Sequence, residues 1–213
     1  MVELKYITLA REPFYEVVRK YICDNSRILD VGSGNGSFAR YFGLDDVYMV
    51  DANKNTCEEL SKKYKNVFFA DASKTLPFSD SFFTIIHCSH LIEHFYPEQL
   101  YSFLLECKRC LKIDGYLIIS APILWPGFYD DMSHVKPYNE KVLLNYLTCI
   151  RKSNSTREII GGFSHVETVK RYYIIKETII NINTGEEILQ DNENEKKIAQ
   201  NGYTIVFKKI TDE

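Results

Sequence analysis

The amino-acid sequence lacks any long hydrophobic run. No apolar stretch approaches the roughly eighteen residues of a membrane-spanning helix, and the amino-terminal segment has no apolar signal core. The chain also lacks an excess of one charge, since 26 Lys and Arg residues stand against 29 Asp and Glu residues and leave a formal net charge of −3. We therefore expect a soluble, cytoplasmic protein with no membrane partner and no nucleic-acid partner, although a local basic patch is compatible with these numbers.

Paired cysteine motifs are also scarce. The chain has six cysteines, and without an export signal we expect them to be reduced. Cys107 and Cys110 form a C-x-x-C motif, but no second pair follows, and apolar residues recur at helical spacing from Glu98 to Lys112. This pattern favours a helix with Cys107 in the core over a zinc site or a thioredoxin-like motif.

Strand and helix patterns alternate along most of the chain. With 213 residues, 45% of them hydrophobic, we expect a single domain over residues 1–213 with one sizeable core. Residues 1–24 show helical spacing, residues 25–150 repeat a strand–helix–strand order, and residues 151–213 hold two further β-rich runs. The repeat predicts parallel strands joined by right-handed crossovers. A charged stretch near residues 181–201 predicts a mobile insertion.

The most informative stretch is a glycine-rich turn that follows an apolar strand. Residues 27–38 have the sequence RILDVGSGNGSF, which places an acid and three glycines at Asp30, Gly32, Gly34 and Gly36. Glycine tolerates positive φ and lets the backbone approach a ligand closely, and Ser37 can cap the helix that follows. The spacing differs from the G-x-G-x-x-G of dinucleotide sites, and the Asp30 carboxylate would repel a pyrophosphate but suits an ammonium group. We expect a small ligand on this turn.

Two further apolar runs end in an acid, at Asp51 and at Asp71. Three successive strands therefore bring a carboxylate to the same edge of a sheet, although aspartates that merely end strands and cap helices would give a similar pattern. With the glycines, this constellation resembles the class I S-adenosylmethionine-dependent methyltransferases over roughly residues 25–150. A Leu-Pro-Phe phrase that begins at Leu76 supports the resemblance, although Thr84 stands where the family usually has Asp.

The resemblance implies a Rossmann-like α/β fold, a three-layer α/β/α sandwich with a seven-stranded, mostly parallel sheet and an antiparallel C-terminal strand. It also implies S-adenosylmethionine as the cofactor. Asp30 would hold the methionine amino group, directly or through water, the loop glycines would lie beneath the amino-acid and ribose parts, and Asp51 would bind the ribose hydroxyls. The other implied cofactor-binding residues are Ala52, Asp71 at the adenine amine, Ala72, His87 and Cys88.

Three histidines and an acid cluster just after the fourth apolar run, at His87, His90, Glu93 and His94. His90 and His94 lie one helical turn apart, which is compatible with metal ligands. His87, however, is expected on a strand, and the resemblance assigns this region to the cofactor and acceptor pocket. We expect no metal here.

An aromatic and proline-rich segment follows the fifth strand, over residues 121–138. Loops at this position form acceptor pockets in open α/β sheets, although the segment could equally just pack over the sheet. The predicted pocket residues are His90, Trp125, Tyr129 and Tyr138. His134 is the candidate catalytic base, because histidine titrates near neutral pH, and the alternative is a histidine bonded to backbone in a tight loop.

These features predict a methyltransferase acting on a small-molecule acceptor. No Asn/Asp-Pro-Pro-Tyr phrase follows the fourth strand, which argues against amino methyltransferases that act on adenine, cytosine or glutamine. Phrases like that around His134 occur in methyltransferases of sugar and surface-glycan pathways, which favours a hydroxyl on a sugar or other metabolite, while Asp130 and Asp131 keep an amine acceptor open. The alternatives are a non-catalytic protein of the same fold that binds or activates a partner and, less favoured by the glycine spacing, a nicotinamide oxidoreductase.

Overall fold

The computed structural model describes residues 3–148, 157–175, 178–180, 187–189 and 197–211. The α-helices are α1 (Glu12–Arg19), α2 (Ser37–Phe42), α3 (Lys54–Ser61), α4 (Pro97–Cys110) and α5 (Glu140–Leu147). The strands are β1 (Ile28–Val31), β2 (Tyr48–Asp51), β3 (Asn66–Phe69), β4 (Phe83–Ser89), β5 (Leu111–Pro122), β6 (Phe163–Ile174), β7 (Thr178–Ile180), β8 (Glu187–Leu189) and β9 (Ile198–Lys209). None of the helices in these segments is long and apolar enough to cross a membrane.

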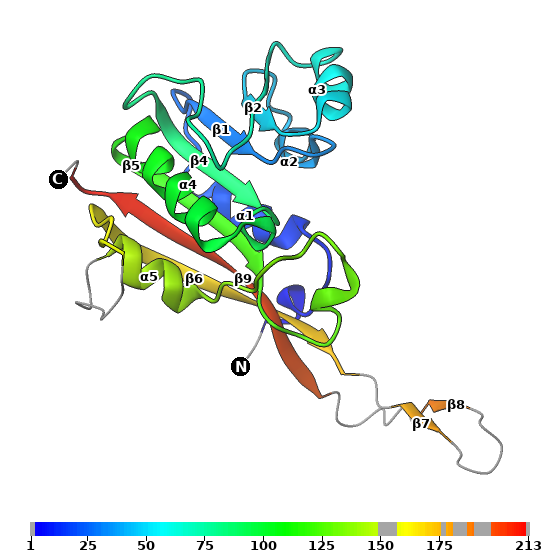
Figure 1. Ribbon diagram of the computed structural model, residues 1–213. Coiled ribbons are helices and arrows are strands. Elements are labelled where there is room, and N and C mark those ends of the chain that lie inside the picture. The colour runs from blue at the N-terminus through cyan, green and yellow to red at the C-terminus, as the bar shows by residue number, and fades with distance from the viewer. Residues whose placement is uncertain (1–2, 149–156, 176–177, 181–186, 190–196, 212–213) are drawn as a thin grey trace.

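Seven strands form one sheet in the order β3-β2-β1-β4-β5-β9-β6 (Figure 1). β1 to β5 pair in parallel, and β9 pairs antiparallel with both β5 and β6. The predicted mostly parallel sheet with an antiparallel C-terminal strand is therefore confirmed. The parallel register sets Asp30 opposite His87, and it brings the carboxyl ends of β1, β2 and β4 to one edge.

Helices cover both faces of the sheet and bury a separate apolar cluster on each. On one face Val18 of α1, Phe38 of α2 and Leu60 of α3 pack on strand residues such as Met49 and Ile85. On the other face α4 and α5 pack on the sheet, as Figure 1 shows. Each fully buried Leu, Ile or Phe contributes about 1.5–3 kcal/mol to folding. The three-layer arrangement follows, and it leaves the loops at the strand ends free to build a site.

The C-x-x-C motif lies in the core, as predicted. Cys107 and Cys110 are both fully buried on α4, where their side chains join the cluster beneath that helix. Burial raises the pKa of the Cys107 thiol well above its ordinary value, so the thiol stays protonated. A buried, protonated thiol has neither the access nor the charge that metal binding or redox exchange requires.

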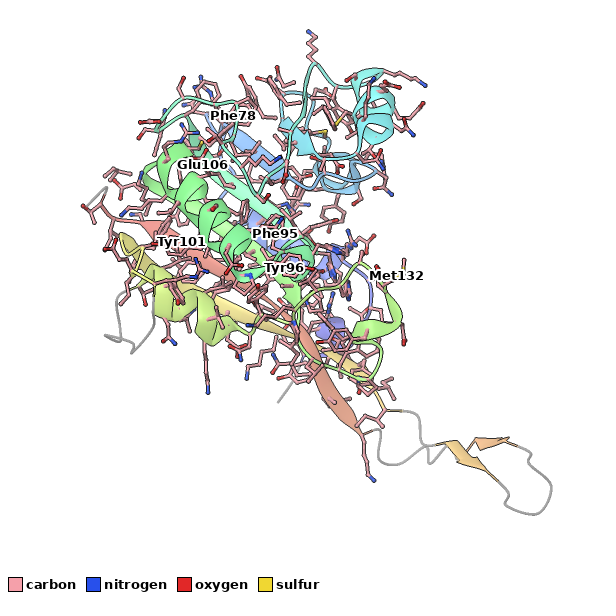
Figure 2. The ribbon with its side chains drawn as sticks, in the orientation of Figure 1. Phe78, Phe95, Tyr96, Tyr101, Glu106 and Met132 are labelled. Atoms are coloured by element: carbon pink, nitrogen blue, oxygen red, sulfur yellow. The ribbon has the colours of Figure 1, made fainter. Side chains whose placement is uncertain are left out.

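Arg109 of α4 fastens the loop between β3 and β4. Its guanidinium donates hydrogen bonds to the carbonyls of Leu76 and Phe78 and to the carboxylates of Asp80 and Glu106, at 2.7–3.1 Å. Glu106 also accepts a hydrogen bond from the Leu76 amide at 2.7 Å, and its hydrogen bond with Arg109 lowers its pKa. Phe78 and Glu106 are labelled in Figure 2. Helix and loop are thereby joined through a half-buried ion pair.

Two local expectations need correction. Over residues 3–24 the chain is helical only in α1, whose first turn contains Pro13, and in a short 3-10 turn over Leu4–Tyr6. Ser37 does not cap α2. The cap is Gly36 in the left-handed region, and the Ser37 hydroxyl instead pairs with that of Tyr15 at 2.9 Å.

The predicted insertion near residues 181–201 contains regular structure. β8 and the first part of β9 fall inside it, and β7 pairs antiparallel with β8 in a second, two-stranded sheet. Figure 1 shows this small sheet beyond the ends of β6 and β9, away from the main body. Residues 181–186 and 190–196 lie outside the described residues. Strands therefore occupy part of the predicted insertion, and its mobility stays a prediction.

Candidate active site

The glycine-rich turn joins β1 to α2 at the carboxyl edge of the sheet. Gly32, Gly34 and Gly36 all have positive φ, which the reversal of the chain between strand and helix requires. The amide of Gly32 donates to the Val50 carbonyl at 2.8 Å, which fixes the turn against β2. A Cβ on Gly34 would meet no atom within 4 Å, so this part of the turn faces open space. The backbone at Gly34 is therefore open to close approach by a ligand.

Asp51 ends β2 and lies directly beside this turn. One carboxylate oxygen accepts a hydrogen bond from the Gly34 amide at 2.9 Å, and the other accepts from the Asn53 amide at 2.8 Å. Asp51 and the exposed Ala52 line an open hollow of about 840 Å³, and His94 and Ser133 also line it. The predicted ribose-binding acid therefore lies at the mouth of a hollow large enough for a nucleoside.

Asp30 lies beneath the turn and not in this hollow. Its side chain is buried, and its carboxylate is 2.8 Å from Nδ1 of His87 on β4. The His87 ring stacks on Phe38 at 4.0 Å between ring centroids and lies edge-on to Tyr15. The pair supports the base of the loop from the α1–α2 face, so direct contact of Asp30 with a ligand stays a prediction.

The remaining predicted cofactor residues stand at the ends of β3 and β4. Asp71 is half-buried, and hydrogen bonds from the hydroxyl and amide of Ser73, at 2.7 and 2.9 Å, lower the pKa of its carboxyl group. Asp71 therefore stays ionised and can accept a hydrogen bond from an amine. Ala72 and Cys88 are buried, and burial raises the pKa of the Cys88 thiol well above its ordinary value.

His90 belongs to a buried polar chain that reaches across the sheet. Nη1 of Arg171 lies 2.7 Å from His90 Nε2, and because a guanidinium can only donate, Nε2 is the acceptor. The other ring nitrogen, Nδ1, is 3.2 Å from a carboxylate oxygen of Glu93. Arg171, from β6, is 7% exposed, and burial lowers its pKa to about 10. The sequence interpretation missed Arg171, because it is 81 residues from its partner.

Glu93, His94 and His134 are brought together by the loop after β5. The amides of Val135 and Lys136 donate to the Glu93 carbonyl at 2.8 and 3.1 Å, which folds that loop back onto the residues after β4. One ligand atom from each of the three side chains lies within 4.8 Å of the others. The sequence grouped Glu93 and His94 with His87 and His90 instead of His134. His87 is excluded because its side chain lies on the opposite face, with Asp30.

Both histidines of this group have a defined tautomer. His134 Nδ1 lies 2.5 Å from the Phe128 carbonyl, and His94 Nδ1 lies 3.0 Å from the Ser133 carbonyl. A carbonyl can only accept, so each Nδ1 bears the proton and each neutral ring keeps a lone pair on Nε2. His134 Nε2 is 3.9 Å from an oxygen of Asp131. For His134 the sequence left two alternatives, a catalytic base and a histidine bonded to backbone. The structure is compatible with both, because Nδ1 makes the backbone bond and Nε2 keeps its lone pair.

The predicted pocket residues have different surroundings in the structure, and their contact with an acceptor stays a prediction. Tyr138 is buried in the core, where its hydroxyl donates to the Phe95 carbonyl at 2.9 Å, so it lies away from the hollow. Trp125 packs against Tyr173 of β6 at 5.4 Å between ring centroids. Tyr129 is 61% exposed, and the neighbouring Met132, labelled in Figure 2, is fully exposed. Of the four predicted pocket residues, His90 is the one that contacts Glu93 and Arg171 in the described part of the chain.

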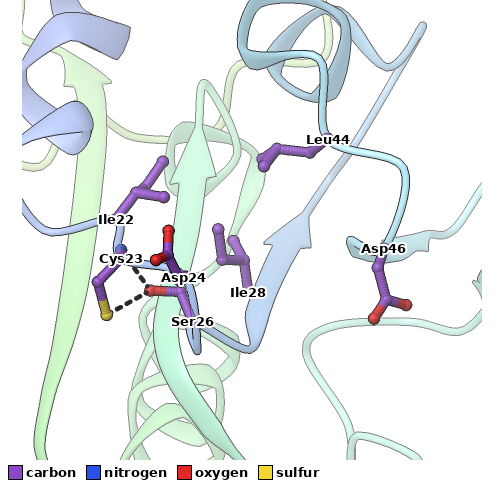
Figure 3. A pocket seen from close by; sticks show the side chains of 7 residues that line it. All are labelled: Ile22, Cys23, Asp24, Ser26, Ile28, Leu44 and Asp46. Carbon is purple, nitrogen blue, oxygen red and sulfur yellow. Dashed lines mark hydrogen bonds between the residues drawn. The ribbon is translucent and has the colours of Figure 1, made fainter.

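A second hollow, of about 360 Å³, lies at the opposite edge of the sheet. Figure 3 shows its lining, Ile22, Cys23, Asp24, Ser26, Ile28, Leu44 and Asp46, at the amino ends of β1 and β2. Ligands of open α/β sheets bind at the carboxyl ends of the strands. The hollow beside Asp51 is therefore the candidate site.

The strand order, the glycine turn and the acids at the strand ends define a Rossmann-like class I methyltransferase fold. Residues 29–119 match the family described as a methyltransferase domain. The match covers less than half of the 213 residues, so this stretch is similar to a methyltransferase domain and the activity of the whole chain is a matter for proposal.

Relatives of known sequence match parts of the chain. It is 30% identical over 119 residues to the ribosomal protein L11 methyltransferase of Prochlorococcus marinus and 34% identical over 101 residues to the uncharacterized methyltransferase YcgJ of Bacillus subtilis. These alignments cover 50% and 44% of this chain but only 38% and 39% of the relatives.

Solved structures extend the likeness to nearly the whole chain. The crystal structure of YcgJ matches with a TM-score of 0.63 and 18% identity over 95% of this chain and all of that one. A Burkholderia thailandensis 1,6-didemethyltoxoflavin-N1-methyltransferase, solved with S-adenosylhomocysteine, matches with a TM-score of 0.61 and 15% identity over 93% of this chain and 77% of that one. At these identities the likeness shows the fold.

Proposed function

We propose that the protein transfers a methyl group from S-adenosylmethionine to a hydroxyl of a small molecule, such as a sugar or another metabolite. The observation that supports this most strongly is Nε2 of His134, which keeps its lone pair while Nδ1 bonds to the Phe128 carbonyl and which lies close to His94, a residue that lines the hollow beside Asp51. An uncharged amine attacks through its own lone pair, whereas a hydroxyl must lose a proton, so a basic nitrogen at this position favours an oxygen acceptor.

The cofactor lies along the carboxyl edge in this proposal. The ribose hydroxyls bond to Asp51, in place of its present bonds to the turn, and the adenine amine donates to Asp71 beside Ala72. Gly34 provides the open backbone surface against which the cofactor packs. Because Asp30 is buried with His87, it acts mainly by fixing the turn, and its contact with the methionine amino group runs through water.

The reaction is an in-line displacement at the methyl carbon. The acceptor hydroxyl gives its proton to Nε2 of His134 while the oxygen attacks the methyl group. The new C–O bond forms as the C–S bond breaks, and that bond's electron pair returns to sulfur, which leaves S-adenosylhomocysteine and an imidazolium. Asp131, 3.9 Å from Nε2, stabilises the imidazolium. Orienting the reactants and excluding water supply the rest of the rate enhancement.

A small acceptor suits the charge of the chain better than a nucleic acid, given the net charge of −3. The named relatives act on different classes of acceptor, one on a ribosomal protein and one on 1,6-didemethyltoxoflavin. The acceptor must therefore be found by assay.

The test begins with calorimetric titration of S-adenosylmethionine and S-adenosylhomocysteine, followed by a screen of hydroxylated metabolites and nucleotide sugars for release of S-adenosylhomocysteine. With an acceptor found, His134→Ala lowers kcat by about 10²–10⁴-fold, as expected for loss of a general base, and leaves cofactor affinity within about twofold. His165→Ala is the matched control, because His165 is exposed and bonds only locally, to Thr168. Failure of both ligands to bind, or an unchanged rate in His134→Ala, contradicts the proposal.

A further inference from the structure

We propose that Glu93, His94 and His134 form a binding site for one divalent transition-metal ion. The three side chains come from two segments, the residues just after β4 and the loop after β5, and they offer two imidazole nitrogens and one carboxylate oxygen. Their ligand atoms lie within 4.8 Å of one another. Metal–ligand bonds of about 2.0–2.2 Å separate ligand atoms by roughly 3–4 Å, so small side-chain rotations close the set around an ion.

The outer contacts of both histidines match those of metal ligands. A ligating histidine usually donates its second ring N–H to a carbonyl or carboxylate, which fixes the tautomer and the orientation of the ring. His94 does this to the Ser133 carbonyl and His134 to the Phe128 carbonyl. The ring centroids lie 5.0 Å apart and the ring planes are tilted by 57°, so the two rings are in contact.

Glu93 supplies the independent observation. The side chain is fully buried, yet within the described part of the chain neither carboxylate oxygen receives a well-formed hydrogen bond. His90 Nδ1, at 3.2 Å, is outside hydrogen-bond geometry, although it brings a favourable dipole. Burying a carboxylate without hydrogen bonds is costly, and a native protein normally satisfies such a group with a partner or an ion. A cation between Glu93 and the two histidines supplies that partner.

The ligand types select the metal. Two imidazoles with one carboxylate suit Zn²⁺, Co²⁺ or Mn²⁺, whereas Mg²⁺ prefers oxygen ligands and retains its water. Three protein ligands also leave at least one coordination position open, as in catalytic rather than structural zinc sites. His94 borders the hollow that contains Asp51, so this open position is accessible from the candidate active site.

The role of the ion, unlike its binding, rests on the proposed function. A bound ion would lower the pKa of an acceptor hydroxyl that coordinates it, and the proton would pass to water before the oxygen attacks the methyl group. With the ion bound, His134 would be a ligand, so its role as general base applies to the protein without the ion. Arg171 and His90 act behind Glu93 as positioning residues, because Arg171 bonds to His90 Nε2 and His90 Nδ1 lies 3.2 Å from the Glu93 carboxylate.

The experiment is a metal titration of the full chain, stripped with a chelator, in the absence of cofactor and acceptor. Zn²⁺ is titrated against a chromophoric chelator and Co²⁺ by its visible absorption, with Mg²⁺ as the comparison ion. We expect one tight site for Zn²⁺ and Co²⁺, a Co²⁺ spectrum without thiolate charge transfer, and no competition from Mg²⁺ at equal concentration. Affinity falls at least tenfold in His94→Asn, His134→Asn and Glu93→Gln, and is unchanged in His165→Asn.

Thermal melts of the stripped variants show whether each still folds, and the two histidine variants keep the test decisive if Glu93→Gln does not. Absence of a one-to-one site in the parent chain, or equal affinity in the folded histidine variants, overturns the metal site. Since no turnover is measured, that result leaves the methyl-transfer proposal standing. A failed acceptor screen, in turn, leaves the metal titration interpretable.

Discussion

Two glycines of the same turn are expected to respond differently to the same substitution. Gly34 and Gly36 have φ of +51° and +72°. An alanine at either position incurs the cost of the left-handed conformation, about 1–2 kcal/mol. Their surroundings differ, because a Cβ on Gly34 would meet nothing within 4 Å, whereas a Cβ on Gly36 would lie 2.8 Å from Cδ2 of Leu60. Overpacking of this kind adds about 1–3 kcal/mol.

The expected loss of stability is therefore about 1–2 kcal/mol for Gly34→Ala and about 2–5 kcal/mol for Gly36→Ala. For a chain of this size, 1 kcal/mol corresponds to roughly 2–4 °C in Tm, so Gly36→Ala melts several degrees below Gly34→Ala. Cofactor affinity is expected to fall more in Gly34→Ala than in Gly36→Ala. The reason is that the methyl group added at position 34 projects into the open space beside Asp51, whereas the one added at position 36 meets Leu60. Scanning calorimetry and titration with S-adenosylhomocysteine measure the two effects.

A double-mutant cycle tests the stated cause. Leu60→Ala in the Gly36→Ala background removes the contact, so it costs less stability there than in the parent chain, by a coupling of about 0.5–3 kcal/mol. A melting temperature for Gly34→Ala at or below that of Gly36→Ala would refute the reasoning, as would additivity in the cycle.

Three further outcomes follow from the same structure. Asp51→Ala lowers affinity for S-adenosylhomocysteine by about 10–100-fold, the worth of a hydrogen bond to a charged group. Asp45→Ala, at an exposed position before the amino end of β2 and so at the opposite edge of the sheet, leaves the affinity unchanged. Equal affinities in the two titrations would remove Asp51 from the ribose site. His87→Phe keeps a ring against Phe38 but leaves the buried Asp30 without its partner. The free energy of unfolding, measured with denaturant, should therefore fall by about 3–5 kcal/mol. A decrease below about 1 kcal/mol would mean that water replaces the hydrogen bond. Arg109 lowers the pKa of Glu106, so the stabilisation from this pair is present above the ordinary carboxyl pKa and disappears as pH falls through the lowered value. The Tm values of the parent and of Glu106→Gln, measured from pH 7 to pH 3, should therefore converge in acid. A constant difference between them would contradict this.

The elements that the sequence predicts well are those set by local pattern. The runs ending at Val31, Asp51 and Phe69 are strands because apolar residues precede turn-forming ones, and parallel topology then brings the strand ends to one edge. The Cys107 and Cys110 side chains follow the helical stripe into the core. The glycine spacing likewise identified the turn, since positive φ at short intervals has few other solutions.

The parts that escaped prediction depend on contacts distant in sequence. His87 and His90 are three residues apart, but strand alternation sends His87 to Asp30, while His90 turns with φ of 55° toward Arg171. His134 reaches Glu93 only because backbone amides of the following residues bond to the Glu93 carbonyl. No period in the sequence encodes such a return of the chain. The burial of Tyr138 could not be read from the sequence for the same reason, since its aromatic character fits a pocket and a core equally well.

The position of β9 between β5 and β6 has a consequence for how the chain folds during synthesis. β6 leaves the ribosome before β9, yet its neighbour in the main sheet is β9, apart from a single bridge between Tyr172 and Ile7. Until β9 inserts, β5 presents an open edge, and β6 lacks the strand on which it docks. Such unpaired edges are where nascent chains misassociate. The slow step in maturation of this protein should therefore be the insertion of β9 between β5 and β6. A chaperone that shields the edge of β5 would act before that insertion.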